Sequence, residues 1–139
     1  ADTVEVKRLF SNSIDTYKVK YKLVSDAEIF NSCAIACADE NVPDIRIASA
    51  QAADELLGIE NVKASFVMYP TGKTVNITAR SLGDLNVQVI MEALGGGGHQ
   101  TMAACQLENV SMAEARERLV SIISGLEVNK ADLQNEQKA

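Results

Sequence analysis

The sequence reads Val62-Lys63-Ala64-Ser65-Phe66-Val67-Met68, then Tyr69-Pro70-Thr71-Gly72, then Lys73-Thr74-Val75-Asn76-Ile77-Thr78-Ala79-Arg80. Apolar residues alternate on both sides of the middle four residues, and alternation is the pattern of a half-buried β-strand. Proline second and glycine fourth in the middle tetrapeptide are typical of a β-turn. The run therefore predicts a β-hairpin. The second strand carries a polar face made of Thr74, Asn76, Thr78 and Arg80.

Upstream of this hairpin, the sequence predicts one strand and one helix. Residues 28–38 are mostly apolar and end in Ala34-Ile35-Ala36-Cys37-Ala38, which is typical of a buried strand. Asn41 and Pro43 follow in the positions of an N-cap and a first-turn proline. Apolar residues at helical spacing predict a helix that ends at Gly58: Ile45, Ala48, Ala52 and Leu56.

Downstream of the hairpin, two further helices flank a glycine run and a short strand. The first is predicted over residues 85–94 and ends at Gly95-Gly96-Gly97-Gly98. The apolar residues 102–107 predict the strand. Ser111-Met112-Ala113-Glu114 is a capping box, which opens a helix that we expect to end at Gly125. Its inward-facing residues are expected to be Ala115, Leu119, Ile122 and Ile123.

Strands and helices interleave around one hairpin, so the expected fold class is α/β or α+β, with a mixed β-sheet covered by helices. A chain of 139 residues is long enough for a single domain. We expect residues 1–26 to form a helical connector, 27–126 the domain, and 127–139 a polar, disordered tail.

The composition narrows the classes of partner. With 47% hydrophobic and 23% charged residues, the chain has the balance of an ordinary soluble protein, and no apolar run is long enough to span a membrane. The net charge of −6 disfavours a general grip on long nucleic acid, which requires a basic surface. A small anion held by a few local donors remains compatible with this charge.

The glycine run is the first candidate site, because His99 follows it directly. Consecutive glycines suggest a backbone that takes positive φ angles or approaches a partner closely, and several N–H groups can then converge on a phosphate. The alternative is a flexible loop that only ends a helix. The neighbouring imidazole favours a ligand, since it can donate to a phosphate oxygen or stack on a base.

Arg80-Ser81 is the second candidate. A strand-end arginine offers phosphate a planar fork of donors, and Ser81 adds a hydroxyl group. Taken alone, Arg80 fits a solvated or salt-bridged surface residue better than a phosphate ligand. Both candidates gain weight only if the fold brings residues 80 and 99 together.

The sequence offers no convincing metal site. Cys33, Cys37 and Cys105 are expected to be reduced, buried thiols of a cytosolic protein. Positions 33 and 37 of one strand lie about 13 Å apart, so the two thiolates cannot share a zinc ion with His99. One histidine also cannot supply a binuclear site, and a nucleophilic pair of His99 and Cys105 lacks an orienting group.

Two segments resemble the DHH-associated domain, the C-terminal domain of the DHH phosphoesterase superfamily. They are Asn76-Ile77-Thr78-Ala79-Arg80-Ser81 and Gly96-Gly97-Gly98-His99, with Ala103-Ala104 three residues further on. The fourth glycine, the Cys105-Gln106 after Ala103-Ala104, and the run from Ser81 to Met91 are similar to the cyclic-di-AMP phosphodiesterase branch.

This resemblance implies a division of labour. Residues 1–26 would be the linker from a DHH catalytic domain, which would hold two divalent cations, typically manganese; the present chain would hold no cofactor and no catalytic residue. The substrate-binding residues implied are Arg80, Ser81, Gly96, Gly97, Gly98 and His99. The resemblance allows as partners a cyclic dinucleotide or short oligonucleotide, the DHH domain and a second copy of the chain in a homodimer, with no membrane contact by this segment. The implied location is the bacterial cytoplasm, with the parent protein anchored through upstream segments.

Three functions remain open from the sequence. The chain is the substrate-binding domain of a cyclic-di-AMP phosphodiesterase, the nucleic-acid-binding domain of a DHH-family single-strand exonuclease or oligoribonuclease, or a non-catalytic dimerisation or regulatory module.

Overall fold

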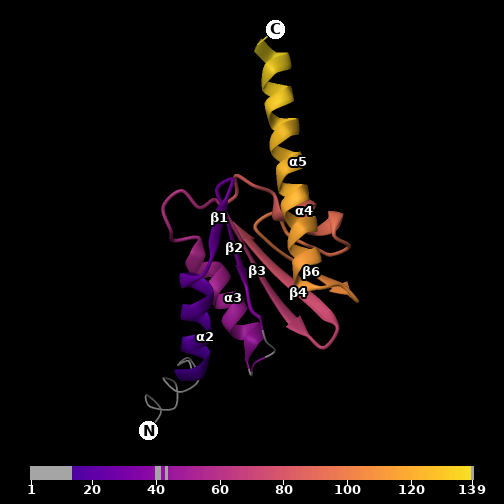
Figure 1. The fold of residues 1–139 in the computed structure, drawn as a ribbon. Helices are drawn as coiled ribbons and strands as arrows, with labels where there is room; N and C mark the ends of the chain where they lie inside the picture. The colour runs from indigo at the N-terminus through magenta and orange to yellow at the C-terminus, as the bar shows by residue number, and fades with distance from the viewer. Residues whose placement is uncertain (1–13, 40–41, 43, 139) are drawn as a thin grey trace.

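A computed structural model describes residues 14–39, 42 and 44–138 (Figure 1). The described residues form a single α+β domain with a six-stranded mixed sheet, in the strand order β1-β2-β3-β4-β6-β5. This confirms the expected fold class. In chain order the elements are α2 (Ile14–Ser25), β1 (Glu28–Phe30), β2 (Cys33–Cys37), α3 (Ile45–Leu56), β3 (Ala64–Thr71), β4 (Thr74–Ser81), α4 (Val87–Ala93), β5 (Gly97–Gly98), β6 (Met102–Glu108) and α5 (Met112–Lys138).

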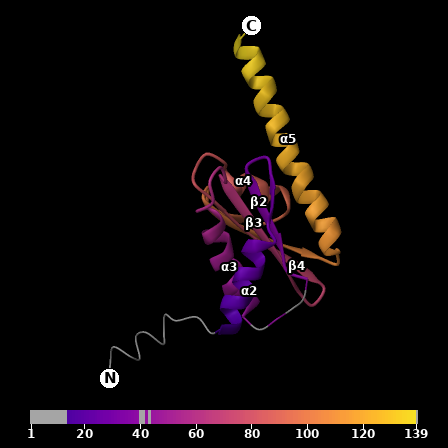
Figure 2. The same ribbon diagram turned by 60° about the vertical axis from the view of Figure 1, so that its left-hand side comes forward.

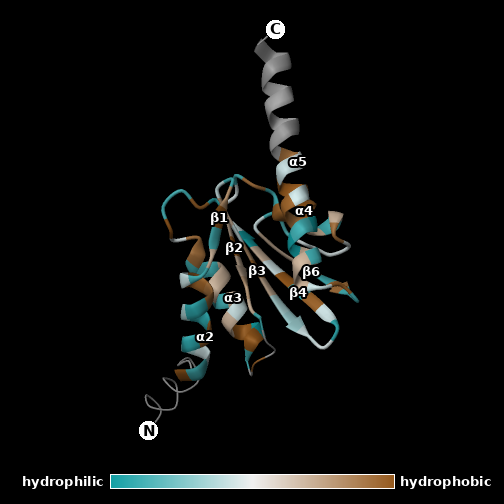
Figure 3. Ribbon diagram, viewed as in Figure 1, coloured by the Kyte–Doolittle hydropathy of each residue, from teal (hydrophilic) through white to brown (hydrophobic). Residues whose placement is uncertain are grey.

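Helices cover both faces of the sheet. Figure 2 shows α2 and α3 on one side of the strands and α5 on the other. Strands β2 and β3 are parallel and are joined through α3, whereas the other strand pairs are antiparallel. Helices α3 and α5 mix hydrophobic and hydrophilic residues along their described turns, as expected for helices with one buried face (Figure 3).

The alternation of side chains along β3 creates two separate cores. Phe66 and Met68 lie in the larger core, which α4 and α5 cover and which includes Leu119 and Ile123. Val67 points to the opposite face and packs against α2 and α3, in a smaller core with Leu23 and Leu56. The alternating pattern of the sequence thus fixes which residues of this strand face which helices.

The predicted hairpin is confirmed, but its turn was placed two residues too early. Thr71 pairs with Thr74, so the turn residues are Gly72 and Lys73, and Gly72 has a φ of 60°. Glycine at the first central position is the pattern of a type II′ turn, whose twist suits a hairpin. Pro70 belongs to β3 instead. The nitrogen of Pro70 lies on the edge of β3 that faces β2, where the Met68 carbonyl accepts a hydrogen bond from Ala38 N–H. Because β2 ends before it reaches Pro70, the missing N–H interrupts no ladder.

The single strand predicted over 28–38 is wrong, because this run forms two short antiparallel strands. Phe30 pairs with Cys33, and the intervening Asn31 and Ser32 have φ angles of 50° and 64°. Positive φ at both central residues defines a tight type I′ turn. The predicted N-cap Asn41 lies outside the described residues, as does Pro43. Helix α3 begins at Ile45, with Asp44 as its N-cap.

The helix predicted after Ser111 begins as expected but ends elsewhere, and the helix predicted over 85–94 is the shorter α4, Val87–Ala93. Asn86 caps α4, since its side-chain oxygen accepts from the N–H groups of Gln88 and Val89. Ser111 caps α5, with its hydroxyl accepting from Glu114 N–H. The stop predicted at Gly125 is wrong, because α5 continues past it to Lys138. The disordered tail expected over residues 127–139 stays a prediction. One glycine costs only about 1 kcal/mol within a helix, and the following residues include many helix formers and no proline.

The connector predicted over 1–26 is helical in its described part, α2, and residues 1–13 lie outside the description. Leu23 joins the smaller core, so α2 packs onto the domain. None of the described helices has the length and apolar character needed to cross a bilayer.

Candidate ligand-binding groove

The α2–α3 side of the sheet is covered only in part, and the uncovered part forms a groove of about 660 Å³. Its volume lies within the ordinary range for small-molecule sites. Helix α3 supplies one wall, and the face of β4, β6 and β5 supplies the floor. The lining residues are Arg46, Ala50, Tyr69, Thr71, Asn76, Ile77, Thr78, Arg80, Gly97, Gly98, Met102, Ala103, Ala104, Cys105 and Gln106.

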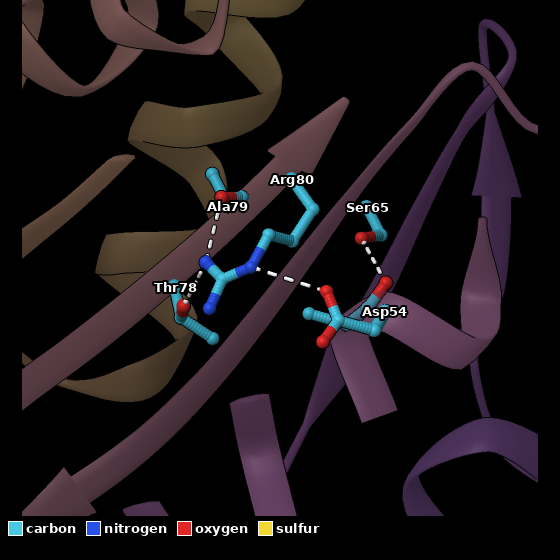
Figure 4. A network of polar contacts seen from close by, with 6 residues as sticks. Asp54, Ser65, Thr78, Ala79 and Arg80 are labelled. Carbon is cyan, nitrogen blue, oxygen red and sulfur yellow. Dashed lines mark hydrogen bonds and ion pairs between the residues drawn. The ribbon is translucent and has the colours of Figure 1, made fainter. Parts of the chain in front are cut away.

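Arg80 lines this groove and is held from two sides (Figure 4). Its Nη1 donates to Thr78 Oγ1 at 2.9 Å and to the Ala79 carbonyl at 3.0 Å. Its Nε lies 3.2 Å from Oδ1 of Asp54 on α3, an ion pair in which the Nε–H makes no hydrogen bond. The side chain is 13% exposed. These contacts use Nη1 and Nε, so Nη2 is the atom that a bound anion can reach without displacing a contact.

Ser81, the other predicted residue at this strand end, does not line the groove. Its hydroxyl donates to the Leu85 carbonyl at 2.6 Å and accepts from Gly83 N–H at 2.9 Å. The side chain is buried, and it closes the loop between β4 and α4. This position gives Ser81 a structural role; its predicted contact with substrate stays a prediction.

The glycine run contains glycines that the packing of the fold requires and one that is free to face a ligand. A Cβ on Gly96 would lie 2.1 Å from the Ala104 carbonyl, and one on Gly98 would lie 2.5 Å from Ala103 Cα. Gly98 also has a φ of 146°. The close approach that these two residues require is therefore to strand β6. Gly97 has open space around its Cβ position and lines the groove.

His99 lies beside the groove and is exposed. Its N–H donates to the Met102 carbonyl at 2.6 Å, which places it opposite Met102 in the antiparallel ladder. Arg80 pairs with Met102 from the other side. Residues 80 and 99 thus flank one residue of β6, at roughly 10 Å across two strand spacings. The fold brings the two predicted elements together, although His99 is not part of the lining.

The lining residues that were not among the predicted site residues include Arg46, Tyr69 and Asn76. Arg46, on α3, adds a second cation, and its nearness to Tyr69 partly offsets the effect of burial, which raises the pKa of the phenol. Asn76 belongs to the polar face that the sequence had revealed on β4. Arg46 and Tyr69 carried no signal, because only the packing of α3 on β3 places them in the groove.

The cysteines correct one expectation. Cys33 and Cys105 are buried, but Cys37 is exposed at the end of β2, and no disulfide joins the three. Burial of its thiol raises the pKa of Cys105 to about 11. Burial also raises the pKa of Cys37, against an opposing effect of Arg116. Across the described part of the chain, no three His, Cys, Asp or Glu side chains are grouped closely enough to hold a metal ion.

Comparison with known proteins gives consistent matches. The family model described as "DHHA1 domain" matches residues 33–127. The chain is 50% identical over 121 residues to the cyclic-di-AMP phosphodiesterase GdpP of Geobacillus thermodenitrificans, covering 86% of this chain and 18% of that protein. It is 46% identical over 125 residues to the cyclic-di-AMP phosphodiesterase PdeA of Listeria monocytogenes, covering 88% and 19%. The chain therefore spans about a fifth of the length of these relatives.

A solved structure shows the same fold. The exopolyphosphatase-related protein from Bacteroides fragilis aligns with a TM-score of 0.77 and 16% identity, covering 90% of this chain and 39% of that chain. At this identity the likeness concerns the fold alone.

Proposed function

This chain belongs to the DHHA1 domain family, and we propose that it is the substrate-binding domain of a metal-dependent phosphodiesterase that hydrolyses cyclic di-AMP to linear di-adenylate. The observation that carries the proposal is the open groove, which has one cation in its α3 wall and a second cation and a glycine backbone in its floor. The identity of 46–50% to two cyclic-di-AMP phosphodiesterases supports the choice of ligand.

The two arginines suit a ligand with two phosphate groups. Arg46 lies near the start of α3, by Tyr69, and Arg80 lies near its end, by Asp54. Tyr69 and Arg80 occupy well-separated positions on adjacent strands, because Tyr69 pairs with Asn76, four residues before Arg80. Four residues of a strand span about 13 Å. An extended anion with two charges can contact both arginines, whereas a single phosphate can contact only one.

The hydrolytic step is assigned to a different part of the parent protein. No group of His, Cys, Asp and Glu side chains among the described residues is suited to hold a metal ion. In this proposal a DHH domain holds two divalent cations, manganese in kind, and the present chain binds and orients the substrate. The parent works in the bacterial cytoplasm, where cyclic dinucleotides act as signals.

The test is a titration of the 139-residue chain by two-dimensional NMR. The ligands are cyclic di-AMP, linear di-adenylate, AMP and a short single-stranded oligonucleotide. We expect cyclic di-AMP to shift the backbone signals of Arg80, Gly97 and Gly98. Arg80→Gln should weaken binding by about tenfold or more, the usual cost of losing a charged hydrogen bond.

The matched control is Arg118→Gln. Arg118 is also an arginine in an ion pair, with Glu114, but it lies on α5, away from the groove. It removes the same charge and should leave binding unchanged. Shifts with the oligonucleotide alone would favour the nuclease function, and an absence of shifts with all four ligands would overturn the proposed role.

A further inference from the structure

Asn76 is a buried amide whose orientation is fixed by its neighbours. Its side chain lines the groove, and the residue is 6% exposed. Its Nδ2 donates to the Tyr69 carbonyl at 3.3 Å and to Thr71 Oγ1 at 2.8 Å. A backbone carbonyl can only accept a hydrogen bond, so the atom facing it must be the amide nitrogen. The two positions of this amide are therefore not interchangeable, and the oxygen occupies the other one.

The oxygen of this amide is available to a ligand. Both hydrogens of Nδ2 have acceptors, whereas Oδ1 has no hydrogen-bond partner among the described residues. Oδ1 is also absent from the set of fully enclosed side-chain atoms that lack a hydrogen-bond partner, so a ligand can reach it. The groove thus contains an acceptor that is fixed in direction before any ligand binds.

We propose that Asn76 determines base specificity, by accepting a hydrogen bond from an exocyclic amine of the bound nucleotide. An adenine presents such an amine, whereas guanine and hypoxanthine present a keto oxygen at the same ring position. A keto oxygen would place two acceptors against each other, and each would lose its hydrogen bond to water without replacement. This inference rests on the proposed function, because it requires a nucleotide in the groove.

The position of Asn76 relative to Arg80 fits this role. The two residues lie on the same face of β4, four positions apart, which corresponds to about 13 Å. A nucleotide whose phosphate contacts Arg80 therefore extends along the strand toward Asn76. The contact itself joins two neutral groups, the amine and the amide oxygen, so it does not depend on the charge of Arg46 at the same end of the groove.

Gln106 provides the internal comparison. It pairs with Asn76 across β4 and β6, also lines the groove, and is exposed. An exposed glutamine amide can turn to present either its oxygen or its nitrogen. It can therefore bind an amine or a keto group equally well. The amide of Asn76, which cannot turn, is therefore the one that distinguishes an amine from a keto group.

The experiment compares cyclic di-AMP with cyclic di-IMP by calorimetry on the 139-residue chain. The two ligands share sugars and phosphates and differ in an amine against a keto oxygen. We expect the wild-type chain to prefer cyclic di-AMP by about tenfold or more. Asn76→Ala should reduce this preference to less than about threefold, and Gln106→Ala should leave it in place. Arg80→Gln should weaken both ligands by a similar factor.

A second readout needs no variant, which matters because Asn76 also supports the hairpin through Tyr69 and Thr71. The side-chain amide signals of Asn76 in wild-type chain should shift on adding cyclic di-AMP and stay nearly unchanged with cyclic di-IMP at equal occupancy. Equal affinity for the two ligands would overturn the role of Asn76 and leave the proposed function intact. If neither ligand bound, the proposed function itself would fail, and this inference with it.

Discussion

Replacing Gly96 and Gly97 separately by alanine tests which glycines serve the fold and which serve the ligand. The two residues are neighbours in the same run, and each substitution adds one methyl group. Only at Gly96 would the added methyl group point into strand β6. Its new Cβ would lie 2.1 Å from the Ala104 carbonyl oxygen and 2.5 Å from Cys105 Cβ. At Gly97 the same methyl meets nothing within 4 Å.

The expected loss of stability depends on whether the atoms that the new methyl group meets can move away. Contacts below 3.0 Å require a shift, and at Gly96 the obstructing atoms belong to the backbone of β6, which β4 holds on its other edge. Overpacking usually costs about 1–3 kcal/mol, and a fixed backbone places Gly96→Ala at or above the upper end. At about 3 kcal/mol the melting temperature should fall by roughly 10 °C for a domain of this size. Gly97→Ala should stay within about 0.5 kcal/mol of wild type.

Urea and thermal unfolding, followed by circular dichroism, give both values. Calorimetric titration with cyclic di-AMP then gives the other half of the comparison, because Gly97→Ala narrows the groove and should weaken binding in a protein of normal stability. The reasoning is refuted if Gly96→Ala is as stable as wild type, or if Gly97→Ala unfolds as easily as Gly96→Ala.

Three further predictions address single side chains. Asp54→Asn removes a carboxylate that is 67% exposed and competes with a ligand for Arg80, so phosphate-ester affinity should rise about two- to fivefold by calorimetry; a loss of affinity would mean that Asp54 positions the guanidinium instead. Ser81→Ala should cost about 1–3 kcal/mol in urea unfolding, because it leaves a partly buried carbonyl and an N–H of its loop without their partner; unchanged stability would contradict the structural role. Because the folded state raises the pKa of Cys105 from 9.0 to about 11, the unfolded chain loses this proton first, and stability should fall as pH rises across that interval. Cys105→Ala should flatten this decline, and a wild-type curve that is already flat would count against the buried thiol.

The elements that the sequence predicted well are those with a repeated pattern. Alternation in β3 and β4 places Phe66 and Val67 on opposite faces, and both are fully buried because helices cover both sides. Helical spacing identified Ala48, Ala52 and Leu56, all of which are buried in the structure. Hydrophobic periodicity follows directly from which face of an element is buried, so predictions based on it agree with the structure.

The elements that the sequence misplaced depend on a single residue or on distant contacts. Pro70 suggested a turn, but it is tolerated in β3 because its N–H position faces no neighbouring strand. Asn31 and Ser32 form a turn within an otherwise apolar run. A two-residue I′ turn is too short to interrupt the apolar pattern, and its positive φ angles are visible only in the structure. Gly125 suggested a helix end, although glycine weakens a helix without ending it.

The residues of the candidate site also divide into those with a local sequence pattern and those placed by distant contacts. Arg80 and the glycine run were visible as local motifs, and the strand ladder brings them together on either side of Met102. Arg46 and Tyr69 were invisible, because their place in the groove depends on how α3 crosses β3. Asn76 lay between these cases: its presence on a polar face was evident, but the fixed direction of its amide depends on the Tyr69 carbonyl.

The acidity of the chain and its proposed anionic ligand are compatible for a physical reason. A net charge of −6 weakens long-range attraction of a polyanion, which favours contacts that act at short range and in fixed directions. The groove supplies such contacts: a guanidinium held by Thr78 and Asp54, and an amide held by Tyr69 and Thr71. Asp54 also lowers the affinity of Arg80 for any simple anion that cannot make further contacts. If the proposed roles of Arg80 and Asn76 hold, a ligand that combines phosphate with a correctly placed amine binds better than inorganic phosphate, because only the former contacts both groups.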